Sequence, residues 1–133
     1  MRYLLNQIKQ ASESFPHLAP RLFQSDAQDL QLPSSHLSSL ENSFDAVFSN
    51  ATLHWCKRSP IDVLKGVKKV LKKNGQGRFV AEMGGFLNCV GVRSAVYQVM
   101  RERGHTPEEK DPWWFPTDEE YRRVRFNSNC IIT

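Results

Sequence analysis

A polar and aromatic stretch that follows an apolar run holds the residues of this chain best suited to chemistry. The run at residues 44–49 predicts a strand covered on both faces, and Asn50, His54 and Trp55 come directly after it. Ligands of open α/β sheets bind beyond the carboxyl ends of the strands, so these three residues are candidate site residues by position. His54 is suited to orient a carboxylate or to act as a base, whereas a lone histidine is more often a structural hydrogen-bonding group.

A second chemically interesting stretch is the dense aromatic cluster near the end of the chain. Thr117 and Glu120 have the spacing of a capping box, which predicts a helix that begins at Asp118 and presents Tyr121 on one side. Two interpretations of the aromatic residues at 113–115 remain open. They form a hydrophobic plug against the sheet, or they form a lid whose rings wall a substrate pocket.

Composition and charge narrow the class of protein. A chain of 133 residues with 40% hydrophobic content suits one globular domain with a core of its own. Its net charge of +4 is spread through helical patterns and mixed with acids, so we expect no nucleic-acid partner. Cys56, Cys89 and Cys130 form no CxxC pair and have no histidines at ligand spacing, which argues against a disulfide framework and a metal site. No apolar run has the length of a secretory leader or a membrane span, and we expect a cytoplasmic protein with no membrane partner.

The elements that must position these residues alternate between helices and strands. Apolar spacing and turn signals predict helices at 1–14, 60–73 and 86–103, and strands at 18–24, 44–49 and 78–83. Ser59 and Pro60 suit the start of the second helix, and Asn74 and Gly75 suit its end. Its lysines are interpreted as a solvated face rather than a phosphate or membrane patch. We expect the helix at 86–103 to pack on the sheet and on this lysine-rich helix.

This alternation is typical of an α/β protein with a parallel sheet. Three strands are few for such a sheet, and they leave an open apolar edge unless something covers it. We expect one partial domain at residues 1–124, followed by an irregular tail at residues 125–133.

Three pieces of sequence, in this order and spacing, carry a resemblance to a known family. They are FDAVFSNATLHW at 44–55, VLKKNGQGRFVAEMGGFLN at 70–88 and PWWFPTDEEY at 112–121. Together they resemble the class I S-adenosylmethionine-dependent methyltransferases, specifically the trans-aconitate methyltransferase-like group, over residues 2–124. The resemblance implies a partial Rossmann-like methyltransferase sheet with parallel strands flanked by helices and its first strands missing. It also implies S-adenosylmethionine as the cofactor and a small-molecule carboxylate as the methyl acceptor.

On the cofactor side, the resemblance assigns five residues. Asp26 and the backbone N–H of Ala27 match positions that read adenine, because a carboxylate accepts from the exocyclic amine and an N–H donates to a ring nitrogen. A plain turn or a helix cap would use Asp26 equally well. Asn50, Ala51 and Leu53 match the strand end that lines the methionine end of the cofactor.

On the acceptor side, the resemblance turns His54 and Trp55 toward the substrate, and we assign them as the catalytic candidates. The residues that match its substrate entrance and lid are Glu82, Gly84, Trp114, Phe115 and Tyr121. Arginines that could supply positive charge to a polycarboxylate are Arg78, Arg93, Arg122 and Arg123. The reaction implied is a direct displacement at the sulfonium methyl, which depends on positioning more than on acid–base chemistry.

The chain departs from the family in its cofactor loops. Neither the glycine-rich loop nor the acidic ribose-binding residue of the family has a match here, so we expect a truncated methyltransferase with impaired cofactor binding. The alternative is a non-catalytic interaction module or remnant, which associates with a second copy or a paralogue through its open sheet edge.

Overall fold

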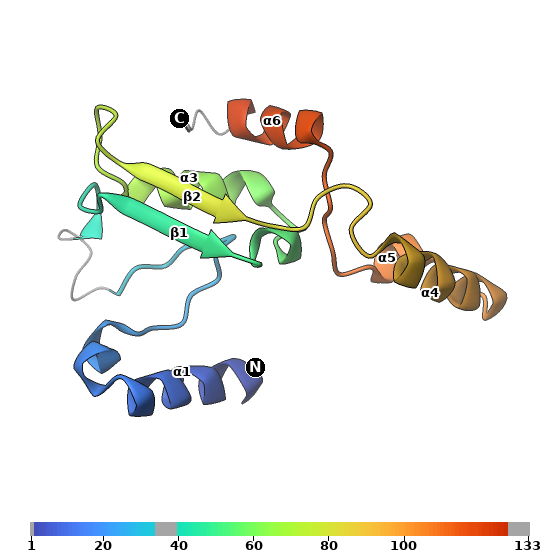
Figure 1. The fold of residues 1–133 in the computed structure, drawn as a ribbon, viewed down its shortest axis with the longest axis horizontal. Helices are drawn as coiled ribbons and strands as arrows, with labels where there is room; N and C mark the ends of the chain where they lie inside the picture. Colours follow the sequence, from blue (N-terminus) through green and yellow to red (C-terminus); the bar gives the residue numbers. More distant parts are fainter. Residues whose placement is uncertain (1, 34–39, 128–133) are drawn as a thin grey trace.

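The protein is described here by a computed structural model, which covers residues 2–33 and 40–127 (Figure 1). Its elements are α1 (Arg2–Ser14), the 3₁₀ helix η1 (Pro16–Arg21), β1 (Ala46–Asn50), the 3₁₀ helix η3 (Leu53–Trp55), α3 (Pro60–Val70), β2 (Arg78–Glu82), α4 (Val90–Glu102), α5 (Pro107–Lys110) and α6 (Asp118–Asn127). This is a mixed α/β fold with a small parallel sheet flanked by helices, and it is consistent with the partial Rossmann-like methyltransferase fold that the sequence predicts.

The core lies between one face of the sheet and α3. β1 and β2 pair in parallel, with Val47 opposite Phe79, and these two side chains face the helix. The apolar stripe of α3 meets them, and Leu64 at its centre is 1% exposed. Burying one such side chain contributes about 2 kcal/mol, so this stripe is the main reason that α3 stays on the sheet. Tyr121 of α6 packs against the same core.

The opposite face of the sheet is open in the part of the chain that the structure describes. Phe48 and Val80 are paired neighbours on that face, and their side chains are 70% and 56% exposed. The expectation of a strand covered on both faces is therefore wrong for β1. A continuous apolar run tells which side chains avoid water, but it does not supply the element that covers them.

The strand expected at residues 18–24 is also wrong. Residues 16–21 form η1, which contains Pro16 and Pro20. Proline fixes φ near the helical value and has no N–H to donate to a strand partner, so both prolines favour the 3₁₀ turn. The described residues accordingly hold two strands, β1 and β2, where the sequence predicts three.

Helix α4 is confirmed as a helix, but its expected packing is wrong. It begins at Val90 rather than at Phe86, because Leu87 and Cys89 both adopt positive φ, at 67° and 55°. It buries none of its side chains and lies beside α5, away from the sheet and from α3 (Figure 1). None of the helices in the described ranges combines the length and apolar character that a membrane crossing requires.

The local signals are confirmed for α6 and only in part for α3. Pro60 begins α3, but the Ser59 hydroxyl makes no cap bond and the helix ends at Val70 rather than at Lys73. Asn74 and Gly75 adopt positive φ, at 62° and 74°, in the turn between α3 and β2. Thr117 and Glu120 form the capping box, in which the Glu120 carboxylate accepts from the Thr117 N–H at 2.8 Å and the Thr117 hydroxyl accepts from the Glu120 N–H at 3.2 Å. α6 continues to Asn127, three residues into the segment expected to be irregular, and the rest of that segment lies outside the described residues.

Candidate functional site

The site begins at His54, which η3 holds just beyond the carboxyl end of β1. The backbone N–H of Gly84, beyond the end of β2, donates to Nδ1 of His54 at 3.1 Å. Nδ1 therefore carries no proton, and the N–H of the neutral ring is at Nε2. The backbone carbonyl of His54 accepts from the N–H of Trp114 at 2.8 Å. His54 is thus a structural hydrogen-bonding group that still offers one N–H donor, which suits it to orient a carboxylate but leaves no free ring nitrogen for a role as a base.

Gly84 is a glycine because nothing larger fits between its neighbours. A Cβ at this position would lie 2.6 Å from Cε1 of Phe115 and 2.2 Å from Nδ2 of Asn88. The aromatic ring cannot move as freely as the amide, so the approach of Phe115 to the backbone requires a residue without a side chain. This close approach brings Phe115 within 5.5 Å of the His54 ring, measured between centroids.

Four rings then form what we call the aromatic cluster: His54, Trp55, Trp113 and Phe115. Trp55 lies 5.5 Å from His54 and 5.7 Å from Trp113, and Trp113 stacks on Phe115 at 5.8 Å. Such offset pairs contribute about 1 kcal/mol each beyond burial. Trp55 remains 53% exposed, so the cluster has a solvent-facing side. The aromatic segment packs on His54 at the carboxyl ends of the strands, where it is placed to serve either as a plug or as a wall.

Trp114 and Tyr121 lie apart from this cluster and contact each other, with ring centroids 6.1 Å apart. Tyr121 lines a cavity of about 320 Å³ between the end of β2 and the start of α6. Met83, Gly85 and Thr117 are among its other lining residues. Of the predicted substrate-side residues, Gly84 and Phe115 therefore lie at the aromatic cluster, whereas Trp114 and Tyr121 lie apart from it.

The end of β1 carries a strained backbone. Ala51 has a φ of 50°, a conformation that costs a residue with a Cβ about 1 kcal/mol. Its N–H donates to the backbone carbonyl of Glu82 at 3.0 Å and to the Glu82 carboxylate at 3.2 Å. Strain of this kind collects at functional sites, where the surrounding structure holds it in place. Glu82 is thus a support for Ala51 at the ends of both strands.

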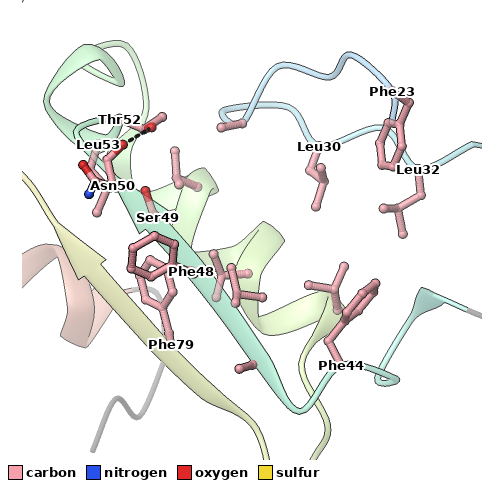
Figure 2. A pocket seen from close by; sticks show the side chains of 16 residues that line it. Phe23, Leu30, Leu32, Phe44, Phe48, Ser49, Asn50, Thr52, Leu53 and Phe79 are labelled. Atoms are coloured by element: carbon pink, nitrogen blue, oxygen red, sulfur yellow. Dashed lines mark hydrogen bonds between the residues drawn. The ribbon is translucent and has the colours of Figure 1, made fainter. Parts of the chain in front are cut away.

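An open groove of about 500 Å³ runs beside β1, on the side away from β2 (Figure 2). The segment that carries Phe23, Leu30 and Leu32 forms its far wall. Of the predicted cofactor residues, Ala27, Asn50 and Leu53 line it. Leu53 is 4% exposed and belongs chiefly to the core. None of the residues that line the groove is charged.

Asp26 sits in a tight turn next to this groove. Its Oδ1 accepts from the Gln28 N–H at 2.8 Å, and its Oδ2 accepts from the Arg58 guanidinium at 2.6 Å. The Gln28 N–H and Arg58 hold the pKa of this carboxyl below its ordinary value. The turn interpretation is therefore confirmed for Asp26, and an adenine amine would share the carboxylate with Arg58.

Of the four candidate cations for a carboxylate acceptor, three form ion pairs and the fourth lies away from the site. Arg93 forms an ion pair with the buried carboxylate of Asp111, Arg122 with Asp118 and Arg123 with Glu119. Arg78 lies at the amino end of β2, opposite the end that carries the site. The pair of Arg93 with Asp111 depends on how α4 and the loop after α5 are placed in space, whereas the two pairs of α6 have the local i,i+4 spacing of one helix.

Sequence reasoning missed two contributors to the site: Arg58, which pairs with Asp26, and Asp111, which connects α4 to the aromatic segment. Trp113 was among the aromatic residues predicted as a plug or a lid, and it joins the aromatic cluster. Arg58 gave no signal because Asp26 is 32 residues away in the chain, and Asp111 gave none toward α4 because Arg93 and Tyr97 are 18 and 14 residues away.

Comparison with known proteins identifies the family. Residues 3–81, more than half of the chain, match the family model described as a methyltransferase domain, and the chain belongs to this family. Its members generally use S-adenosylmethionine.

One similar protein is named uncharacterized methyltransferase C70.08c, from Schizosaccharomyces pombe. It is 44% identical over 88 residues, which cover 62% of this chain and 33% of that protein. The chain therefore spans about a third of the length of the curated relative it matches.

Proposed function

We propose that this chain carries part of an S-adenosylmethionine-dependent methyltransferase, with the groove on the cofactor side and the aromatic cluster on the acceptor side. The observation that supports this most is that Ala27, Asn50 and Leu53, which resemblance alone assigns to the cofactor, line one groove at the carboxyl end of β1. They come from a turn, a strand end and a 3₁₀ helix, and only a folded chain brings them together.

The described residues fit the cofactor in part. The uncharged groove suits a flat, apolar ring system, the Asp26 carboxylate accepts from an exocyclic amine, and the Asn50 amide both donates and accepts. The cofactor, when bound, supplies the methyl group. The expected weakness of binding is part of the proposal, since Arg58 competes for Asp26 and no glycine-rich loop is among the residues of this chain.

For the acceptor we propose a small carboxylic acid, as the resemblance to the trans-aconitate methyltransferase-like group implies. Its oxygen is already ionised at neutral pH, so no base is needed, and positioning supplies most of the rate. His54 offers its Nε2–H as a donor, and Trp55, Trp113 and Phe115 offer an apolar wall. Because the arginines of α4 and α6 are paired, this donor is the contact that we assign to the acceptor's charge.

Calorimetric titration with S-adenosylmethionine tests the proposal. We expect weak saturable binding to the folded chain and a loss of binding in Asn50→Ala. Gln76→Ala, at an exposed turn at the other end of the sheet, is the matched control and should bind as the wild type does. Absence of binding to a chain with a cooperative thermal transition would refute the cofactor assignment.

A second candidate function is association through the open edge of β1. Asp45 and Ala51 use their backbone groups toward β2, so the alternation along the strand turns those of Ala46, Phe48 and Asn50 toward the groove. An unpaired strand with exposed Phe48 beside an uncharged groove is a template for strand addition from a second copy or a paralogue.

Light scattering separates this candidate from the first. Association through β1 predicts a concentration-dependent rise in mass that Phe48→Lys abolishes. Phe86→Lys is the control, since Phe86 is 64% exposed and lies away from this edge. A wild-type chain that remains monomeric at high concentration rules out self-association.

A further inference from the structure

Asp111 is the most buried charged side chain in the described part of the protein. Its carboxylate is 3% exposed, although it lies in a short loop between α5 and the aromatic segment. A charge is withdrawn from water at a cost unless partners satisfy it. Partners around the Asp111 carboxylate must therefore compensate for its burial.

The partners of this carboxylate come from two directions. On one side, Arg93 and Tyr97 of α4 both donate to Oδ2, the Arg93 Nε at 3.0 Å. On the other side, the backbone N–H of Trp113 donates to Oδ1 at 2.9 Å. We call these four residues the Asp111 junction. The Asp111 carboxylate thus joins α4 to Trp113, the first residue of the aromatic segment at 113–115.

The backbone of Asp111 is fixed as well. Its carbonyl accepts from Nζ of Lys57 at 3.0 Å, and Lys57 lies two residues after Trp55. Its N–H donates to the carbonyl of Pro107 at 2.8 Å. The junction therefore cannot rotate away from the loop that carries the aromatic cluster without breaking hydrogen bonds on both sides.

Two routes connect the junction to His54. Along the backbone, the N–H of Trp114, next to Trp113, donates to the carbonyl of His54. Through side chains, the guanidinium carbon of Arg93 lies 5.3 Å from the centroid of the Phe115 ring, which contacts His54. Asp111 restrains the first route directly, and it restrains the second by holding Arg93.

We infer that Asp111 is a positioning residue for the acceptor side of the site, because it fixes where Trp113 and Phe115 lie over His54. That this side of the site receives the acceptor rests on the proposed function. The positioning of Trp113 and Phe115 does not depend on it. Asp111 acts through Trp113 and Arg93 and touches none of the reacting groups.

The tryptophans of the chain provide a direct test. The sequence has three: Trp55 and Trp113 belong to the aromatic cluster, and Trp114, whose ring contacts Tyr121, is joined to His54 through its backbone N–H. In Asp111→Asn, which keeps the shape and removes the charge, we expect a red shift of tryptophan emission and loss of the near-ultraviolet circular dichroism bands, with far-ultraviolet bands unchanged. Exchange of the Trp114 amide should speed up roughly tenfold, the factor expected when a hydrogen bond of ordinary strength is lost.

Glu109→Gln is the matched control, because it removes an exposed acidic charge two residues away. It should leave the spectra and the exchange rate as they are in the wild type. Arg93→Lys, which keeps the charge and loses the planar contact with Phe115, should fall between the two. Wild-type spectra and exchange in folded Asp111→Asn would overturn the inference. Should that variant fail to fold, Tyr97→Phe decides in its place, and an unchanged spectrum overturns the inference equally.

Cofactor titration keeps this inference apart from the proposed function. Asp111→Asn should bind S-adenosylmethionine as the wild type does, because Asp111 lies among the acceptor-side contacts and not along the groove. A wild-type chain that binds no cofactor refutes the proposed function, while the spectra still decide whether Asp111 positions the aromatic segment. A loss of cofactor affinity in Asp111→Asn alone contradicts a role confined to the acceptor side.

Discussion

The aromatic cluster and the groove lie on either side of the carboxyl end of β1, and they are built differently. Around the cluster, hydrogen bonds join Gly84 to His54 and Trp113 to Asp111, and the rings contact one another. Beside the groove, no strand among the described residues pairs with the free edge of β1, and the far wall is held by exposed contacts such as Arg58 with Asp26. The aromatic cluster is therefore fixed by contacts within this chain, whereas the groove keeps backbone groups of β1 that no described strand uses.

Leu64→Ala should weaken both regions together. Leu64 lies in the core under β1 and β2, and its truncation should cost about 3 kcal/mol because a cavity remains. Chemical denaturation measures this loss. Val92→Ala, at a side chain that is 62% exposed, should change stability by less than about 0.5 kcal/mol. Loss of near-ultraviolet signal without loss of cofactor binding would show that the aromatic cluster and the groove do not both depend on the core around Leu64.

Gly84→Ala should damage the aromatic cluster selectively. The added methyl group overlaps Phe115, and we expect a loss of about 2 kcal/mol with altered tryptophan fluorescence. Gly91→Ala in α4 meets no atom within 4 Å and should be neutral or stabilising. Equal stability of the two variants in denaturant titrations would contradict the close packing of this side.

Ala51→Gly should act in the opposite direction. Glycine adopts positive φ without a Cβ penalty, which relieves about 1 kcal/mol of strain, and the greater freedom of its unfolded chain reduces the net gain to about 0.5 kcal/mol at most. Ala95→Gly, within α4, should lose about 1 kcal/mol. A destabilised Ala51→Gly in thermal melts would mean that the strain at the end of β1 is absent in solution.

Acid should weaken the Asp111 junction by a smaller amount. Burial acts to raise the pKa of Asp111, but hydrogen bonds from Tyr97, the Trp113 N–H and Arg93 outweigh it, and the pKa lies below the ordinary 3.8. The native carboxylate therefore binds fewer protons than the unfolded one. Its contribution is complete above pH 3.8 and is lost as the pH falls through the lower native value.

Denaturant titrations across this acid range measure that contribution. The slope of stability against pH should be smaller in Asp111→Asn than in the wild type, since the amide does not titrate. Arg93, which pairs with the carboxylate, stays charged throughout this range. Identical slopes would show that the carboxylate is not held as described.

Arg58→Ala should have the smallest effect on stability, because its ion pair with Asp26 is largely exposed. The melting temperature should hardly change. If Asp26 reads adenine, S-adenosylmethionine should bind more tightly, by no more than about fivefold. Lys65→Ala, which removes a comparable exposed pair with Asp62, is the control. Weaker binding in Arg58→Ala would make Arg58 itself part of the cofactor side.

Prediction from sequence succeeded where the signal was local. The helix at α1, the helix from Pro60, the turn at Asn74 and Gly75 and the capping box at Thr117 all depend on residues within a few positions of each other. It failed at η1, where the prolines outweighed a short apolar run, and it failed for the packing of α4, which lies against α5 rather than the sheet. His54 was found from its place after a strand, but its bond to Gly84 spans 30 residues and has no local signature.

The sequence by itself determined the α/β alternation, the parallel pairing that such alternation requires and the family resemblance that the match over residues 3–81 supports. Only the tertiary structure decided which polar groups are engaged. It paired Arg93 with Asp111 and Asp26 with Arg58, fixed the proton of His54 at Nε2 and left one edge of β1 without a strand partner among the residues described. The physical reason is that hydrophobic periodicity depends on neighbours in the chain, whereas the satisfaction of a buried charge or a strand edge depends on groups that meet only after folding.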